Sequence, residues 1–526
     1  MRTFAVRKEI ALLLAFSLGL GASETAAGDF NGDGFDDLVI GAPYESVGTA
    51  AEAGTAWITY GSAAGLGTTP AGMFILPLVG LPEAAGDRVG AAIAVGNFDG
   101  DAYDDAAIGV PGRTIAGKSH AGLVVVLRGS EFGLSIEGAR LFHQNAKGIK
   151  DKVDAAAKDQ PTHSYEVFGT SMCAGDFDGN GYDDLAIGVV ESLKFKKQSM
   201  DGAGAVHVLY GSGKGLRAKK NQLWHLGAKG IPGDPQAGAA WGLKLAAGDF
   251  DGDGADDLVA GSEQAQFDAD SKGAFSVIYG KPKKGLHRSR AQQFDEASIG
   301  GPSAGGYTAF TYGFAVGDFD DDGRDDLAIG SPGVTLNSQM LCGQFYVMTG
   351  QATGLDAAAT HVWNRTQLLV NGLTQQSLYF ASELASGDFN GDGIDDLAVG
   401  APGQTAGGIQ GCGAVQIFPG TASGITALSD VVIDQNTGTI PGINELGDQL
   451  GAVLAAADFN GDSITDLACG MPFHEANGLD SAGAVLILVG SGTGIATNAG
   501  LFIDESTAVI GAMAASSEQF GDALGK

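Results

Sequence analysis

Short apolar segments recur along the chain directly after clusters of acidic residues. In the first copy the cluster DFNGDGFDD (29–37) precedes LVIGA, and about 25 residues after the cluster begins comes the run TAWITYG (55–61). Such short runs, rich in β-branched and aromatic residues and closed by glycine, are typical of strands separated by tight turns. An apolar–glycine pair lies upstream of most copies and a less regular apolar segment lies downstream, so we expect four short strands per copy.

The acidic cluster occurs seven times, and its starting points lie 68–79 residues apart. Self-similarity at a fixed period indicates a repeat architecture, and four-stranded units repeated in a closed ring form a β-propeller. We therefore predict an all-β fold, a seven-bladed β-propeller of four-stranded blades over residues 28–526. The seven clusters are predicted to be loops at residues 29–37, 97–105, 176–184, 249–257, 318–326, 388–396 and 458–466.

The two ends of the chain are predicted to close the ring together. The first copy lacks its upstream apolar–glycine pair, because Ala22 stands where the glycine would be. The chain ends in EQFGDALGK, which contains the pair Phe520–Gly521 but no acidic cluster after it. We expect this tail to complete blade one as its inner strand; the alternative is a truncated and frayed tail.

Residues 1–27 have the pattern of a signal peptide. Arg2, Arg7 and Lys8 precede the apolar stretch 10–20, and small residues follow. No other apolar run reaches spanning length, so we expect no transmembrane segment and a secreted protein, extracellular or periplasmic. An ordinary buried N-terminal helix is the alternative.

The spacing of the acidic loops predicts calcium ligation. Oxygen-bearing side chains stand at positions one, three, five and nine of each loop, and glycine at position six permits the sharp curl that lets them converge on a hard cation. Position twelve is apolar or a thiol, where an EF-hand needs glutamate, so the closing ligand is expected to be the aspartate at nine. With the backbone carbonyl at position seven, the predicted ligands are Asp29, Asn31, Asp33, Phe35, Asp37, Asn97, Asp99, Asp101, Tyr103, Asp105, Asp176, Asp178, Asn180, Tyr182, Asp184, Asp249, Asp251, Asp253, Ala255, Asp257, Asp318, Asp320, Asp322, Arg324, Asp326, Asp388, Asn390, Asp392, Ile394, Asp396, Asp458, Asn460, Asp462, Ile464 and Asp466.

Two of the seven predicted Ca²⁺ sites depart from the pattern. Ala102 and Ser463 replace the glycine at position six, and Thr465 replaces the aspartate found at position eight in the other copies. We expect sites two and seven to bind more weakly. The alternative, that Asp-Gly-rich segments are only surface turns, explains one copy better than it explains seven in one register.

The formal charge of −32 is concentrated in these repeats. The seven segments hold 30 of the 62 acidic residues, and seven divalent ions would reduce the charge from −32 to −18, since each ion adds two. A strongly acidic chain repels nucleic acid, so no nucleic-acid partner is expected. Of the 30 Lys and Arg residues, however, 20 lie between Arg140 and Arg290. This basic sector (140–290) suggests an anionic partner; the alternative is solvated loops that balance nearby acids.

The sequence gives little support for catalysis. Four cysteines show no CxxC spacing and are expected to be structural thiols, and the histidines fall in no nucleophile motif. His207, inside the run GAVHVLYG, is expected to be a packed strand residue.

The combination of Phe-Gly, a DxDxDGxxD loop and Gly-Ala-Pro, seen at 41–43 and 400–402, resembles the FG-GAP repeat of the integrin α-subunit head. The resemblance covers nearly all of the mature chain and implies a seven-bladed propeller, with calcium in loops on the face opposite the ligand-binding face. Thr311 and Ala381 replace the glycine of the Phe-Gly pair, which puts the local loop geometry of those blades in question more than their fold.

From these observations we expect a calcium-stabilised binding or adhesion module, monomeric, for a protein or carbohydrate ligand. The alternative is a secreted hydrolase or lyase that acts on polysaccharide or phospholipid from a site in the propeller channel.

Overall fold

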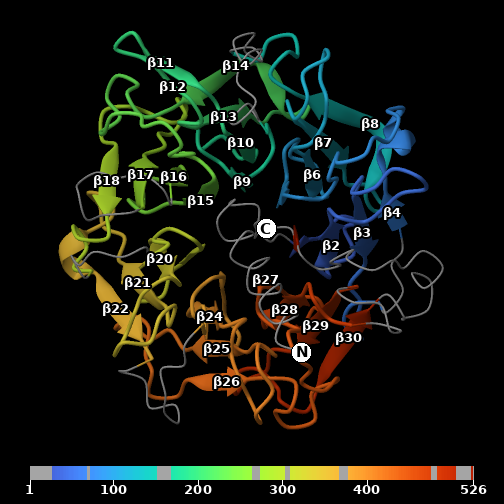
Figure 1. Cartoon of the computed structure of the whole chain (residues 1–526), viewed down its shortest axis with the longest axis vertical. Coiled ribbons are helices and arrows are strands. Elements are labelled where there is room, and N and C mark those ends of the chain that lie inside the picture. Colours follow the sequence, from blue (N-terminus) through green and yellow to red (C-terminus); the bar gives the residue numbers. More distant parts are fainter. Residues whose placement is uncertain are drawn as a thin grey trace.

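Seven antiparallel sheets surround a common axis in the computed structural model of the chain (Figure 1). Each sheet has four strands in simple sequence order, and the sheet of blade one carries a fifth. This confirms the predicted seven-bladed β-propeller. The structure describes residues 27–67, 72–150, 167–262, 273–301, 308–365, 377–475 and 482–504, and the backbone of residues 523–524; the predicted signal peptide therefore lies outside the described residues, except for Ala27.

The first strand of each blade lies nearest the axis, and neighbouring first strands contact one another. These inner strands are β1 (Ala27–Gly28), β5 (Ile93–Gly96), β9 (Met172–Gly175), β15 (Lys244–Gly248), β19 (Phe314–Gly317), β23 (Leu384–Gly387) and β27 (Val453–Ala457). The second strands, which follow the acidic loops, are β2 (Asp37–Ala42), β6 (Asp105–Val110), β10 (Asp184–Val189), β16 (Asp257–Ser262), β20 (Asp326–Ser331), β24 (Asp396–Gly400) and β28 (Asp466–Met471).

The third strands coincide with the glycine-closed runs of the sequence. They are β3 (Thr55–Thr59), β7 (Leu123–Arg128), β13 (Ala205–Tyr210), β17 (Ala274–Ile278), β21 (Gln344–Met348), β25 (Val415–Phe418) and β29 (Ala484–Leu488). The outer fourth strands are β4 (Gly72–Phe74), β8 (Ser135–Phe142), β14 (Arg217–Trp224), β18 (Gln292–Asp295), β22 (His361–Asn364), β26 (Val431–Ile433) and β30 (Gly500–Asp504). Elements outside this scheme are the hairpin β11 (Leu193–Phe195) and β12 (Gln198–Met200), the 3₁₀ turns η1 (Leu76–Val79) and η3 (Ala357–Ala359), and β31 (Ala523–Leu524).

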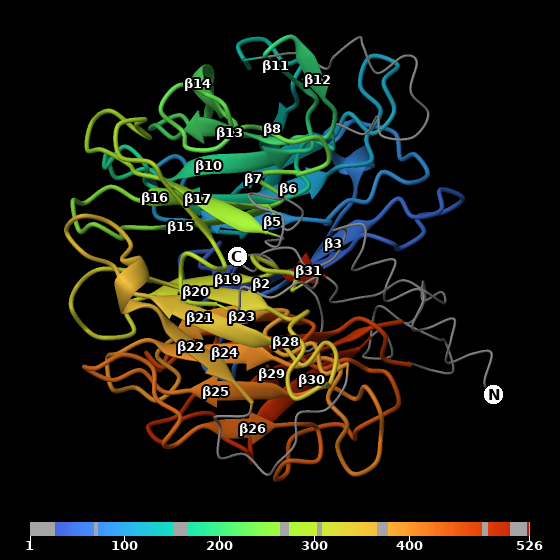
Figure 2. The same ribbon diagram turned by 60° about the vertical axis from the view of Figure 1, so that its left-hand side comes forward.

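Both ends of the chain contribute to blade one. β1 pairs with the start of β2, with Gly28 opposite Asp37, and β31 pairs with the second half of β2, with Ala523 opposite Gly41 (Figure 2). The predicted closure by the C-terminal tail is confirmed in this pairing, with the refinement that the inner strand is divided between the two ends. The predicted pair Phe520–Gly521 lies outside the described residues.

The hydrophobic core consists of layers between adjacent sheets. Between blades one and two, for example, Val39 packs in one cluster with Ile108 and Val125, and Leu38 of blade one packs with Val485 of blade seven across the closure. Because both faces of each sheet are covered in this way, the second and third strands are buried along nearly their whole length rather than alternating between buried and exposed residues. Large aromatic side chains such as Phe177 and Trp241 lie in these layers between blades.

In blades two to seven, a residue two or three positions before the inner strand takes a left-handed backbone conformation. The glycine of the apolar–glycine pair has φ of 82°, 83°, 91° and 81° at Gly90, Gly169, Gly242 and Gly451. Thr311 and Ala381 occupy the same place at φ 72° and 64°. The two substitutions thus keep the family geometry at a cost in backbone strain, since side chains with a Cβ disfavour this region.

Candidate calcium sites

The seven acidic loops all lie at one end of the propeller. Each loop begins directly after the inner strand of its blade, and position nine is the first residue of the second strand, as with Asp29 after β1 and Asp37 at the start of β2. Since the seven blades have the same strand order, the loops share one face. We call this end the loop face and the other end the opposite face.

In six loops the chain curls around the carboxylate at position one. In loop one the backbone N–H groups of Asp33 and Gly34 donate to Asp29 Oδ1 (3.1 Å) and Oδ2 (2.8 Å). Equivalent pairs of hydrogen bonds form in loops three to seven. The curl needs a left-handed residue at position six: the glycines there have φ of 82–89°, and Ser463 reaches φ 66°. Loop seven therefore keeps the geometry of its neighbours at a conformational cost.

The aspartate at position nine is buried in every loop. Its Oδ1 accepts the backbone N–H of the glycine that closes the third strand, at 2.7–3.0 Å in all seven blades. Burial is the main cause that raises the pKa of these carboxyls, to about 6 at Asp466, about 7 at Asp37, and about 9 at Asp184. In loops three and five the second oxygen, Oδ2 of Asp184 and Asp326, is buried without a hydrogen-bond partner. A buried carboxylate oxygen in this state lacks the positive partner that its burial requires.

In three loops, three of the predicted acidic ligands converge. Positions one, three and nine come together in loops three and four as Asp176–Asp178–Asp184 and Asp249–Asp251–Asp257, with one oxygen of each within 4.8 Å of the others. In loop five the group is Asp318, Asp320 and Asp322, at positions one, three and five.

In loops six and seven, a side-chain amide nitrogen contacts the buried carboxylate at position nine. The amide nitrogens of Asn390 and Asn460, at position three, donate to the position-nine carboxylates at 3.0 Å and 3.0–3.2 Å. Oxygen donors at this density suit a hard divalent cation such as Ca²⁺, so the residues fit the predicted ion.

Loop two differs from the other six. Asn97 at position one offers one oxygen, which accepts the Gly100 N–H, and its amide nitrogen donates to the Asp101 carbonyl (2.8 Å). Ala102 at position six does not take the left-handed conformation, and Asp99 at position three pairs with Arg128 (2.9 Å). The curl around position one is absent in loop two, whose residues are all described; the weaker binding at site two stays a prediction.

The aspartate at position eight joins neighbouring blades instead of facing its own loop. Asp104 of blade two accepts the backbone N–H of Asp29 in blade one through Oδ2 (3.1 Å), and its own N–H donates to the Asp29 carbonyl (3.1 Å). Six junctions have this inter-blade bond pair, with side-chain bonds of 2.7–3.1 Å, including the closing one between Asp36 and Asp458. A Cβ at Gly28, directly before loop one, would lie 2.6 Å from that carboxylate, which favours glycine at this position.

The residue at position eight therefore connects neighbouring blades, a role that the loop pattern alone did not reveal. At the junction of blades six and seven, Thr465 keeps only the backbone half, donating its N–H to the Asp388 carbonyl (2.9 Å). The Thr465 substitution thus affects the junction rather than the ligand set of loop seven.

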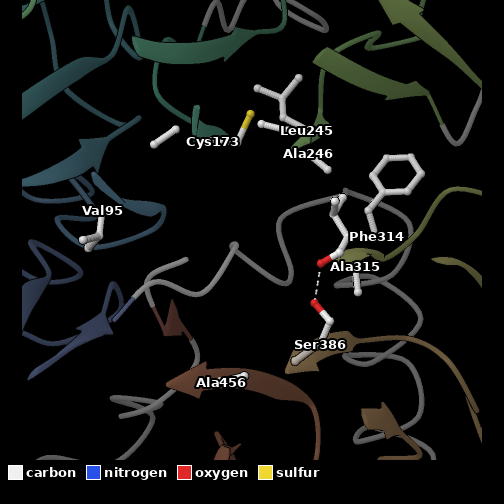
Figure 3. Close-up of a pocket in the computed structure, with 12 residues that line it drawn as sticks. Val95, Cys173, Leu245, Ala246, Phe314, Ala315, Ser386 and Ala456 are labelled. Atoms are coloured by element: carbon white, nitrogen blue, oxygen red, sulfur yellow. Dashed lines mark hydrogen bonds between the residues drawn. The ribbon is translucent and has the colours of Figure 1, made fainter. Parts of the chain in front are cut away.

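A cavity lined mainly by apolar residues lies among the inner strands (Figure 3). The cavity has a volume of about 230 Å³ and is lined by residues of the inner strands, among them Val95, Cys173, Leu245, Ala315 and Ala456. Among the residues that the structure describes, its lining contains no Asp, Glu, His, Lys or Arg side chain, and Ser386 donates its hydroxyl to the Val316 carbonyl. Cys173 contributes a buried thiol to this lining.

The residues of the basic sector divide between the two faces. On the loop face, the turn that holds Lys281, Lys283 and Lys284 packs on acidic loop three, where the backbone N–H of Lys283 donates to the Asp178 carbonyl. On the opposite face, the β11–β12 segment contains Lys194, Lys196 and Lys197. Arg290 pairs with Asp251 of loop four (2.5 Å). Part of the basic charge therefore balances loop acids.

The cysteines and His207 have structural environments. None of the four cysteines forms a disulfide, and all are buried. His207 is fully buried in β13 with its ring edge against Phe168, and burial lowers the pKa of His207 to about 4. The expectation of a packed strand residue is confirmed.

Together these features define a class: a seven-bladed β-propeller whose blades are joined through acidic loops on one face. The chain belongs to the FG-GAP repeat family, whose model matches residues 21–59, 89–127, 168–209, 241–278, 310–347, 380–418 and 450–488, just over half of the chain.

Similar proteins include both enzymes and integrins. The chain is 33% identical over 205 residues to bovine (Bos taurus) phosphatidylinositol-glycan-specific phospholipase D, covering 37% of this chain and 24% of that protein. It is 31% identical over 166 residues to integrin alpha-PS5 of Drosophila melanogaster (31% and 14%) and 29% identical over 257 residues to human (Homo sapiens) integrin alpha-IIb (47% and 22%). The matched segments make up about a quarter or less of each relative. Within the described residues, no helix has the length and hydropathy to cross a membrane.

Proposed function

We propose that this propeller is a secreted, calcium-stabilised binding module that recognises a protein or carbohydrate through its opposite face. The observation that carries the proposal is that the acidic loops on one face are hydrogen-bonded across the blade junctions. In support, the described residues that line the channel cavity include no Asp, Glu, His, Lys or Arg. The loop face is thus occupied by stabilising contacts, which leaves recognition to the other end.

Calcium is proposed at up to seven loops, with sites two and seven weaker. The buried position-nine carboxyls supply the reason, since a cation beside them offsets the cost of keeping them ionised. Each occupied site stabilises the folded state by about 2.7 kcal/mol when calcium is in hundredfold excess over its dissociation constant.

The opposite face offers exposed apolar side chains suited to recognition. Ile443 and Leu446, in the segment that enters blade seven, are 63% and 66% exposed, and Met340 of blade five is 57% exposed. Exposed apolar side chains among polar neighbours are a common feature of binding surfaces.

Protein and glycan arrays, probed with and without calcium, test this proposal. We expect a ligand that binds the wild type in calcium and is lost in the double variant Ile443→Ser/Leu446→Ser, whose loop face is unchanged. The matched control is Leu428→Ser, an 88% exposed residue on a different segment, which should retain binding. Equal binding by all three proteins would contradict recognition through this segment.

An anionic partner at the basic sector is a second part of the proposal. Lys283 and Lys284 are exposed on the loop face, so reversing both to Glu should weaken retention on an anionic matrix. The control Lys196→Glu/Lys197→Glu makes the same charge change on the opposite face. If both variants elute with the wild type, the basic residues only balance loop acids.

A phospholipid hydrolase is the alternative function, because several relatives are named phosphatidylinositol-glycan-specific phospholipase D. Screening the purified chain against phospholipid and glycan substrates distinguishes the two functions. Turnover by this chain would favour the hydrolase over the binding module.

A further inference from the structure

A histidine and two carboxylates lie together on the opposite face, where the chain enters blade seven. Glu445 and Asp448 precede β27, and His474 follows β28. His474 Nδ1 is 3.3 Å from Asp448 Oδ1 and 4.0 Å from Glu445 Oε2, and one possible ligand atom of each residue lies within 4.8 Å of the other two. This cluster is separate from the seven acidic loops.

Blade two has an ordinary ion pair in the same place. Arg113 lies 2.7 Å from Asp87 Oδ2, and that oxygen also accepts the Ala84 N–H (2.9 Å). In blade seven the Glu445 N–H donates to Asp448 Oδ2 (3.2 Å) in the same way. The Arg113 and His474 N–H groups each donate to the carbonyl of the last residue of the preceding second strand, at 3.2 Å.

Two differences between these blades change the chemistry together. The permanent cation Arg113 is replaced by His474, a metal ligand, and the methyl side chain of Ala84 is replaced by the carboxylate of Glu445. An arginine excludes a metal ion from a carboxylate, whereas a neutral imidazole with two carboxylates forms a ligand set of one nitrogen and two oxygens.

The distances in blade seven suit a shared ion better than a closed ion pair. Charge-assisted N–H···O⁻ bonds are about 2.7–2.9 Å long, as in blade two, but the His474 contacts are 3.3 and 4.0 Å. Ligand atoms about 2.1 Å from a tetrahedral ion are about 3.4 Å apart.

Surrounding residues fix the ligands in place. Asp448 is 1% exposed. When the side-chain amide of Gln435 is oriented so that both its oxygen and its nitrogen have hydrogen-bond partners, its nitrogen donates to Asp448 Oδ2 (3.2 Å). The other oxygen, Oδ1, is then directed to His474. The His474 ring stands edge-on to Phe502 at 5.2 Å. Such outer contacts are typical of metal sites. The Glu445 side chain is 39% exposed, which leaves the cluster open to solvent and a fourth position for water or a partner's ligand.

We propose that Glu445, Asp448 and His474 form a site for a divalent transition metal such as Zn²⁺ on the opposite face. Calcium is disfavoured here because it prefers six to eight oxygen ligands, whereas Zn²⁺ takes imidazole nitrogen and carboxylate oxygen in fourfold geometry.

Equilibrium dialysis of the full chain against Zn²⁺, with calcium in excess to fill the acidic loops, tests the site. The wild type should bind one Zn²⁺ per chain. His474→Arg rebuilds the ion pair of blade two, so it should fold normally, with an unchanged unfolding temperature in calcium, yet bind Zn²⁺ at least tenfold more weakly. His287→Arg, a change at an exposed histidine, should keep the site.

A transplant makes the test independent of any loss of folding. The double variant Ala84→Glu/Arg113→His installs the same ligands in blade two and should bind two Zn²⁺ per chain. Absence of Zn²⁺ binding by the wild type, or equal affinity in His474→Arg, would overturn the proposal.

Discussion

Replacing Asp36 tests the inter-blade bond pair at the junction that closes the ring. Asp36 Oδ2 accepts the N–H of Asp458 (3.0 Å), and the Asp36 N–H donates to the Asp458 carbonyl (3.0 Å), across 422 residues of sequence. Asp36→Ala removes the side-chain acceptor and leaves the backbone bond. Asp36→Asn removes the charge but keeps a carbonyl oxygen that can accept the same N–H.

The two variants separate the hydrogen bond from the charge. An N–H left without an acceptor costs about 1–3 kcal/mol, and because Asp36 is half-buried, so that water reaches part of the site, we expect about 1–2 kcal/mol for Asp36→Ala. Burial raises the pKa of Asp36, so the ionised form gains little from its surroundings and Asp36→Asn should cost less than about 1 kcal/mol.

Calorimetry in excess calcium measures the difference. With about 2.1 cal/mol/K per residue, a chain of 526 residues unfolds with an entropy of about 1 kcal/mol/K, so Asp36→Ala should lower Tm by about 1–2 °C. Glu131→Ala, at an exposed residue, is the control and should leave Tm unchanged. An Asp36→Ala variant as stable as the wild type, or an Asp36→Asn variant that loses as much as Asp36→Ala, would refute the reasoning.

Three further predictions concern the loops and the strained positions. The position-nine carboxyls have folded pKa values raised to about 6–9 from an unfolded 3.8, so the folded state binds more protons, and the calcium-free protein should lose stability as pH rises from about 4 through 6–9. The Tm gain on adding calcium should grow over the same pH range. A Tm gain that does not depend on pH would contradict this cause. Ala381→Gly should raise the free energy of unfolding in urea by about 1 kcal/mol, because φ is 64° at this residue. The control Ala398→Gly, within β24, should lower the free energy of unfolding. If both variants are less stable than the wild type, the strain argument is wrong. Asn97→Asp/Ala102→Gly should add one strong calcium site by isothermal titration calorimetry, and an unchanged stoichiometry would mean that loop two is limited by other residues.

The repeat pattern predicted the fold because the sequence signals for the strands of one blade lie close together in the chain. Alternation of acidic loop, apolar strand and glycine-closed strand is visible within about 35 residues, and the period then fixes the number of blades. Position nine could also be predicted, since it is the last acid before the apolar strand.

The contacts between blades could not be predicted from the pattern within one blade. Positions eight and nine are both aspartate in six copies, yet one bonds to the neighbouring blade and the other turns into its own, because successive residues entering a strand point to opposite sides. The available signal was the glycine before six of the seven loops, where a Cβ would meet the position-eight side chain of the next blade; Ala457, before loop seven, is the exception. The cluster at His474 could not be predicted from the sequence, because Asp448 and His474 are 26 residues apart and belong to no repeat motif.

The claim that calcium holds the blades together is tested most directly by the unfolding temperature of the full chain before and after calcium removal at neutral pH. The chain is dialysed with EDTA, and calcium is then restored to hundredfold excess over its dissociation constant, with magnesium as the control ion. We predict a large fall in Tm without calcium, in keeping with about 2.7 kcal/mol for each occupied site, and full recovery with calcium but not with magnesium. An unfolding temperature unchanged by EDTA would contradict the account.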